Sequence, residues 1–119
     1  MVLLKDWIGG REGWVYISRI QGVESLSDVY KVGMTKHDTP EKRIRSLSTA
    51  GLPGHHELVR AWPALEARSI EWNLHKVLKA YAWKKEFFKG IELDRLIELC
   101  DHEITVANEI IRGLFYEES

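Results

Sequence analysis

A small set of polar side chains along the first three-quarters of the chain could act on a phosphate group. Tyr16 and Lys31 lie in two segments rich in β-branched and aromatic residues, Arg43 follows the second segment, and Glu71 and His75 are four residues apart. A phenol and an imidazole can transfer protons, a guanidinium binds phosphate oxygens and a carboxylate binds divalent cations. Such chemistry requires that the elements carrying these residues bring them together.

The segment 13–20 is predicted to be the first strand, because it is rich in the residue types that favour strands and is bounded by glycines. Side chains alternate along a strand, so Tyr16 projects from one face while Val15 and Ile17 project from the other. Val15 and Ile17 are the likelier core residues. A polar loop over 21–28 then leads to the second strand.

The second strand is predicted over 28–34, where alternation places Lys31 and Gly33 on one face and Tyr30 on the other. Lys31 is therefore expected beside Tyr16 on a neighbouring strand. A tyrosine is normally protonated at neutral pH, and a nearby ammonium would favour its ionised form.

A helix is predicted over 40–49, because Thr39 can serve as its N-cap and Pro40 suits its first position. Arg43 and Arg45 then lie early on this helix, just beyond the second strand. Both are also common types for a solvated helix surface, so the sequence leaves a structural role open.

A third strand is predicted over 57–62, preceded by His55 and His56 in a loop. Two adjacent histidines are typical of some metal sites, but no further ligand lies at a metal-site spacing from them. They are interpreted as surface histidines.

The second helix is predicted over 64–81. Glu71 and His75 would share one of its faces, either as site residues or as an exposed i, i+4 pair. Beside them runs an apolar stripe with helical spacing, formed by Ile70, Leu74, Val77, Leu78 and Tyr81.

Residues 82–90 are predicted to be a loop that enters a short strand, with Trp83 next to Lys84 and Lys85. An aromatic ring beside two cations suits a nucleic-acid backbone, although it is also common on ordinary surfaces. From about residue 92 the apolar spacing predicts one long amphipathic helix, or two with a break near 101–102. The predicted fold is therefore α/β (α+β): a small mixed, mostly antiparallel three-stranded sheet flanked by helices, with a long C-terminal amphipathic helix.

The composition is that of a single soluble globular domain, with 45% hydrophobic and 29% charged residues among 119. No apolar run approaches the roughly 20 residues of a membrane span, and the start of the chain is not a convincing signal peptide. One cysteine excludes an internal disulfide and fits a reducing, cytoplasmic compartment. Residues 1–90 carry 15 basic and 10 acidic side chains, whereas 91–119 carry 2 and 8. The basic part would attract phosphate backbones.

Five motifs in order resemble the GIY-YIG nuclease superfamily, and most closely its phage and fungal branch that includes the meiotically up-regulated gene family. They are G-x-V-Y-I at 13–17, Y-K-V-G-x-T at 30–35, P-x-x-R at 40–43, E-x-x-x-H at 71–75 and E-F-F at 86–88. Lys31 occupies the place of the second tyrosine of the wider superfamily. The resemblance implies a nuclease core over 1–90 with an acidic C-terminal extension over 91–119 packed on the same domain.

The resemblance implies a role for each matching residue in phosphodiester hydrolysis. Tyr16 would be the general base, with Lys31 as its cation. Arg43 would bind the phosphate, and His75 would hydrogen-bond it or act as the acid. Glu71 would hold one Mg²⁺, or another divalent cation, as a Lewis acid. Further DNA contacts are expected from Lys36, Arg45, Lys84 and Lys85.

The leading hypothesis is a metal-dependent DNA endonuclease or nickase of phage or mobile-element type. A catalytically silent module that binds nucleic acid or a protein is the alternative. A third hypothesis is a structural or inhibitory phage protein that pairs through its acidic C-terminal helix. That helix is also expected to leave apolar surface for a homodimer.

Overall fold

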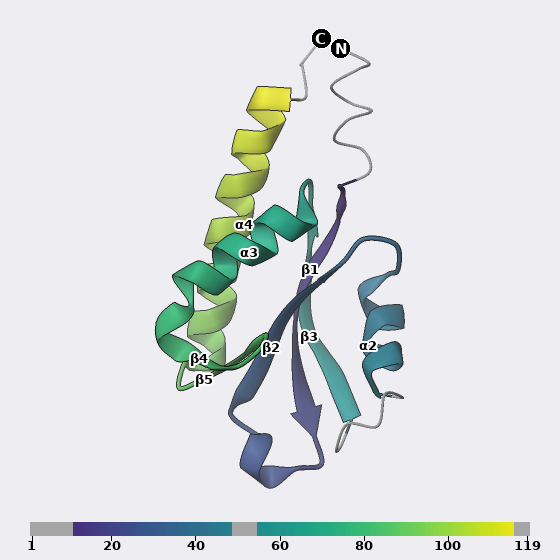
Figure 1. Cartoon of the computed structure of the whole chain (residues 1–119), viewed down its shortest axis with the longest axis vertical. Coiled ribbons are helices and arrows are strands. Elements are labelled where there is room, and N and C mark those ends of the chain that lie inside the picture. The colour runs from purple at the N-terminus through teal and green to yellow at the C-terminus, as the bar shows by residue number, and fades with distance from the viewer. Residues whose placement is uncertain (1–10, 49–54, 116–119) are drawn as a thin grey trace.

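The computed structural model describes residues 11–48 and 55–115 and shows one five-stranded sheet with helices on both sides (Figure 1). The strands are β1 Gly13–Gln21, β2 Val29–Thr35, β3 His55–Ala64, β4 Ala82–Lys84 and β5 Phe87–Lys89. The helices are α2 Pro40–Ser48, α3 Ala67–Val77 and α4 Leu93–Phe115, with 3-10 turns η1 Glu24–Leu26 and η2 Lys79–Tyr81. The strand order is β3-β1-β2-β5-β4 and every neighbouring pair is antiparallel. The predicted fold class is confirmed, but the sheet has five strands rather than three.

The strands β4 and β5 form a short hairpin that extends the sheet beyond β2, where the sequence predicted a loop entering one short strand over 82–90. Each has only three residues, too few for alternation to be visible in the sequence. β5 is held by pairing with β2, where Lys31 lies opposite Phe87 and Val29 opposite Lys89. This pairing ends at Lys31, so the backbone groups of β2 beyond Lys31 are available for hydrogen bonds with residues outside β5.

The helices α3 and α4 cover one face of the sheet, and α2 lies on the other side (Figure 1). Val15 and Ile17 are fully buried on the face under α3 and α4, as predicted. This core also contains Val32, Ile70, Leu74, Leu78, Phe88, Leu96, Cys100 and Ile104. The opposite face is covered as well, so Tyr16 has no exposed surface. Its burial was not expected from strand alternation, because alternation does not show what covers the second face.

The helix α3 is shorter than the predicted segment 64–81. Its first residues belong instead to β3, where Ala64 pairs with Gly13, and its last turn tightens into η2. Ile70, Leu74 and Leu78 are buried as the stripe predicts, whereas Val77 is 44% exposed. Val77 is exposed because it points away from the sheet, on the side of α3 near Val106 of α4.

The helix α4 is a single unbroken element that lies against β3 and α3. The Trp62 indole N–H donates to Asp101 at 3.1 Å, and Asn108 bonds with backbone groups of Pro63 and Leu65 at 2.9 Å each. Towards the end of α4, three apolar side chains are exposed: Val106, Ile110 and Leu114. In the part of the chain that is described, no helix is both long and apolar enough to cross a membrane. Residue 49 of the predicted helix 40–49 lies outside the described residues.

Candidate functional site

Tyr16 and Lys31 meet above Gly33, the residue that pairs with Tyr16 across β1 and β2. A Cβ placed on Gly33 would lie 2.6 Å from Tyr16 Oη and 3.0 Å from Lys31 Nζ. The Lys31 ammonium also lies 5.5 Å from the centroid of the Tyr16 ring. Glycine is needed here because only a residue without a side chain leaves room for both groups. The predicted juxtaposition of Tyr16 and Lys31 on one sheet face is therefore present.

The hydroxyl of Tyr16 is enclosed, and it has no hydrogen-bond partner among residues 11–48 and 55–115. The same is true of the hydroxyl of Ser18, which lies opposite Lys31 in the ladder. A buried hydroxyl usually finds a partner, because leaving it unpaired costs free energy. These two hydroxyls and the Lys31 ammonium thus form a polar cluster inside the sheet face that faces α2.

Lys31 is 5% exposed and forms an ion pair with Glu86, the second of the two residues in the turn between β4 and β5. The sequence motif contained Glu86, but no role was predicted for it. The sequence feature that could have indicated a role for Glu86 is its position directly before two phenylalanines of the sheet, Phe87 and Phe88. The backbone reverses sharply just before it, because Lys85 adopts φ 47°, in the left-handed region. The turn therefore aims the Glu86 carboxylate at Lys31.

Beyond its pairing with β5, the edge of β2 forms hydrogen bonds with two other residues. Both Glu86 and His75 bond with the backbone of Val32. The N–H of Val32 donates to the backbone carbonyl of Glu86 at 3.1 Å. Nε2–H of His75 donates to the carbonyl of Val32 at 2.8 Å. Since Nε2 carries the proton in this bond, Nδ1 is the nitrogen left for other chemistry. The arrangement holds α3 and the β4–β5 turn on either side of the site.

Glu71 lies one helical turn before His75 and is half-buried. Burial raises the pKa of its carboxyl group above the usual 4.5, and the negative charge of Glu86 raises it further. The positive charges of His75, Lys31 and Arg68 lower that pKa by less. Two carboxylates thus repel each other at this place, and a divalent cation would offset the repulsion. Among the described residues no group of three or more His, Cys, Asp or Glu could hold a metal, so water and phosphate oxygens would complete its coordination.

His56 is buried rather than on the surface, which corrects the interpretation of the histidine pair. β3 begins at His55, two residues earlier than predicted, so alternation turns His56 inward and leaves His55 exposed. The His56 ring lies 6.4 Å from the Phe87 ring. Burial lowers the pKa of His56 from 6.5, and the charge of Lys31 lowers it further. His56 is therefore a neutral imidazole close to the Lys31 ammonium.

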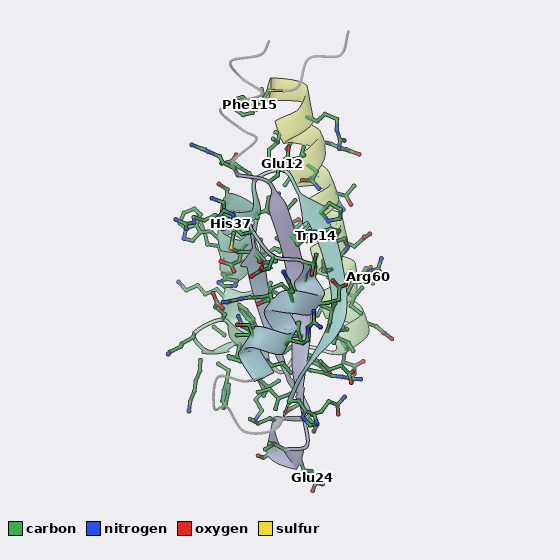
Figure 2. All side chains as sticks on the ribbon, turned by 90° about the vertical axis from the view of Figure 1, so that its right-hand side faces the viewer. Glu12, Trp14, Glu24, His37, Arg60 and Phe115 are labelled. Carbon is green, nitrogen blue, oxygen red and sulfur yellow. The ribbon has the colours of Figure 1, made fainter. Side chains whose placement is uncertain are left out.

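The remaining predicted residues lie on α2, directly after β2, and on the β4–β5 hairpin. Arg43 lies on α2, which stands in front of the sheet in Figure 2, and its Nε is buried without a hydrogen-bond partner in the described chain. Arg45 is exposed on the same helix. Lys36 follows β2 and lines a surface pocket with Arg68. Lys84 and Lys85 are exposed on the β4–β5 turn directly before Glu86.

The comparisons with known proteins assign a family to most of the chain. The family model for the T5orf172 domain matches residues 13–112, which include every element of the sheet and most of α4. This is a phage-associated domain of an endonuclease-related group. No curated protein and no solved structure matches the chain significantly. Because the match spans well over half of its length, the chain belongs to the T5orf172 domain family.

Proposed function

We propose that this protein is a metal-dependent DNA endonuclease or nickase of the GIY-YIG type. The observation that supports this most is the meeting of Tyr16 Oη and Lys31 Nζ above Gly33. An ammonium beside a phenol favours the ionised phenolate, which can accept a proton from water. Family membership supports a nuclease-like or DNA-binding role for a phage-type protein.

In this proposal each polar group has a separate task. Lys31 stabilises the phenolate form of Tyr16, which accepts the proton of the attacking water and becomes a neutral phenol. Arg43 approaches from α2 and binds non-bridging phosphate oxygens. His75 orients the site through Val32 and presents Nδ1 to the phosphate or the leaving group. Glu71 would hold Mg²⁺, which supplies Lewis-acid stabilisation of the leaving oxygen when bound.

One observation favours the alternative, a silent module that binds nucleic acid or a protein. Tyr16 has no exposed surface, and Lys31 is paired with Glu86. A phosphate reaches the hydroxyl of Tyr16 only if the covering side chains move. In the module the same cluster would serve to fix the sheet and the β4–β5 turn, and no cleavage would occur.

A plasmid-nicking assay with Mg²⁺ and with a chelator separates the two functions. The nuclease proposal expects nicking by the wild-type protein with Mg²⁺, none with chelator, and none by Tyr16→Phe or Glu71→Gln. Tyr16→Phe should bind DNA nearly as well as wild type, because only a hydroxyl is removed. Lys31→Met should raise the pH at which activity appears. Absence of nicking by a folded wild-type protein that binds DNA would favour the module.

Three finer statements belong to the same proposal. We place the site within residues 1–90 and treat 91–119 as an acidic extension. We expect the protein to act in the cytoplasm, that of the host where a phage encodes it. A homodimer through α4 would use Val106, Ile110 and Leu114, whose exposed fractions are 39%, 56% and 67%. A monomer by light scattering at tens of micromolar would remove the dimer.

A further inference from the structure

Among residues 11–48 and 55–115, two tryptophan side chains are exposed, and each has at least one lysine ammonium group near its ring. Trp72 of α3 is 63% exposed, and Lys76 Nζ lies 4.2 Å from its ring centroid. Trp83 of β4 is 41% exposed, with Lys84 Nζ at 4.9 Å and Lys89 Nζ at 6.0 Å. Neither ring belongs to the core cluster of the described chain. Large aromatic side chains left in water, each beside a cation, are typical of binding surfaces.

Both tryptophans lie next to a carboxylate of the candidate site. Trp72 follows Glu71 directly on α3, and Trp83 precedes Glu86 by three residues on the β4–β5 hairpin. The two elements meet at Val32, which bonds with His75 of α3 on one atom and with Glu86 on another. The two tryptophan–lysine pairs therefore belong to the two elements, α3 and the β4–β5 hairpin, that meet at Val32.

The hairpin pair also shares a sheet face with the polar cluster. Phe87 lies opposite Lys31 and Lys89 opposite Val29, so Lys31 and Lys89 project from the same face. The Lys89 ammonium in turn lies near the Trp83 ring. A strand of nucleic acid that places a phosphate near Lys31 would therefore pass over Trp83.

We propose that Trp72 and Trp83 stack on unpaired bases of single-stranded DNA on either side of the phosphate that enters the candidate site. This inference rests on the proposed function and names its substrate class: DNA with unpaired nucleotides, rather than continuous duplex. Aromatic rings stack on the faces of bases, and these faces are accessible in single strands but covered in a duplex. The adjacent lysines Lys76, Lys84 and Lys89 bind the phosphates that link those bases. Their positive charge favours a polyanion over a neutral protein surface as the occupant.

Fluorescence anisotropy with three labelled probes in the presence of chelator tests the proposal without any cleavage. The probes are a 20-nucleotide oligothymidine strand, a strand of equal length with abasic sites at its central positions, and a duplex. The abasic strand keeps the phosphates and loses the stacking partners. The variants are Trp72→Ala and Trp83→Ala, each compared with its Phe counterpart. Val77→Ala is the matched control, because Val77 is also an exposed apolar side chain but carries no aromatic ring.

Each Trp→Ala variant should bind oligothymidine about 5- to 150-fold more weakly than wild type. The Phe variants should recover much of the affinity, and the control should match wild type. On the abasic strand and the duplex, the Ala variants should lose little. Wild-type affinity of both Ala variants for oligothymidine would overturn the inference, as would an equal loss on the abasic strand. Since binding is measured without metal, failure of the nicking assay and failure of this inference are separate results.

Discussion

The ring of Tyr16 lies over Gly33, its partner in the ladder between β1 and β2. A Cβ at position 33 would be 2.6 Å from Tyr16 Oη and 2.7 Å from Tyr16 Cζ. The ring is fully buried and cannot swing aside without disturbing its neighbours. Gly33→Ala should therefore lower the free energy of unfolding by about 1–3 kcal/mol, the usual cost of overpacking. Urea unfolding followed by circular dichroism measures this.

Gly113→Ala is the matched control for that substitution. Gly113 lies in α4, and no heavy atom lies within 4 Å of the Cβ that would be added. Alanine is favoured over glycine inside a helix, so Gly113→Ala should raise the free energy of unfolding by about 0.5–1 kcal/mol. If Gly33→Ala were as stable as Gly113→Ala, the result would contradict the close approach of the Tyr16 ring to Gly33.

The ion pair between Lys31 and Glu86 joins β2 to the β4–β5 turn. The Lys31 side chain is 7% exposed and that of Glu86 44% exposed. Glu86→Ala leaves the Lys31 ammonium buried without its counter-ion, so it should cost about 1–2 kcal/mol of stability, less than for a fully buried pair. The double variant Lys31→Met/Glu86→Ala should recover part of this loss, because the unpaired charge is gone. Thermal unfolding of wild type, Glu86→Ala, Lys31→Met and the double variant gives the coupling between the two residues.

The exposed pair of Arg95 and Glu98 on α4 provides the comparison. Their nitrogen and oxygen are 3.6 Å apart, and both side chains are more than half exposed. Glu98→Ala should change stability by a few tenths of a kcal/mol at most. Equal effects of Glu86→Ala and Glu98→Ala would show that Lys31 is solvated rather than held by Glu86.

The sequence predicted the long elements and the pairing of Tyr16 with Lys31 because each follows from local periodicity. Alternation alone placed Lys31 and Gly33 on one strand face, and β1 and β2 are long enough for that signal. The hairpin β4–β5 was predicted only as a loop entering a short strand, because its strands form through pairing with β2 and with each other. Consequently Glu86 could not be predicted as the partner of Lys31, which is 55 residues away in sequence.

The burial of Tyr16 and His56 depended on tertiary structure in the same way. A strand pattern shows which residues share a face but not whether a helix covers it. Here α2 lies against β1 and β3 on the face opposite α3, so polar residues of that face became enclosed. The start of β3 at His55, two residues earlier than predicted, decided which of the two histidines turns inward.

His56 should make stability depend on pH near neutrality. Burial and the charge of Lys31 lower the pKa of His56 in the folded state below its ordinary 6.5. Protons therefore bind more readily to the unfolded chain, so this contribution to stability is present above pH 6.5 and is lost as the pH falls towards the folded-state pKa. His56→Gln should flatten the decline in stability as the pH falls below 6.5. His55→Gln, which changes the exposed neighbour, should leave the decline as in wild type.

Glu71 should show the opposite dependence, because burial and the charge of Glu86 raise its pKa in the folded state. The protonated carboxyl suits the fold, so this contribution to stability is fully present below the ordinary pKa of 4.5 and is lost as the pH rises through the raised value. Glu71→Gln cannot ionise and should therefore be more stable than wild type at pH 7, with the difference vanishing near pH 4.

Mg²⁺ should raise the melting temperature of wild type at pH 7 and leave Glu71→Gln unchanged, since only the carboxylate would hold the ion. Glu109→Gln, an exposed position on α4, controls for the loss of one negative charge. If Glu71→Gln were less stable than wild type at every pH, the Glu71 carboxylate would stabilise the fold. The unfavourable burial and charge repulsion that make Glu71 a candidate cation ligand would then be contradicted.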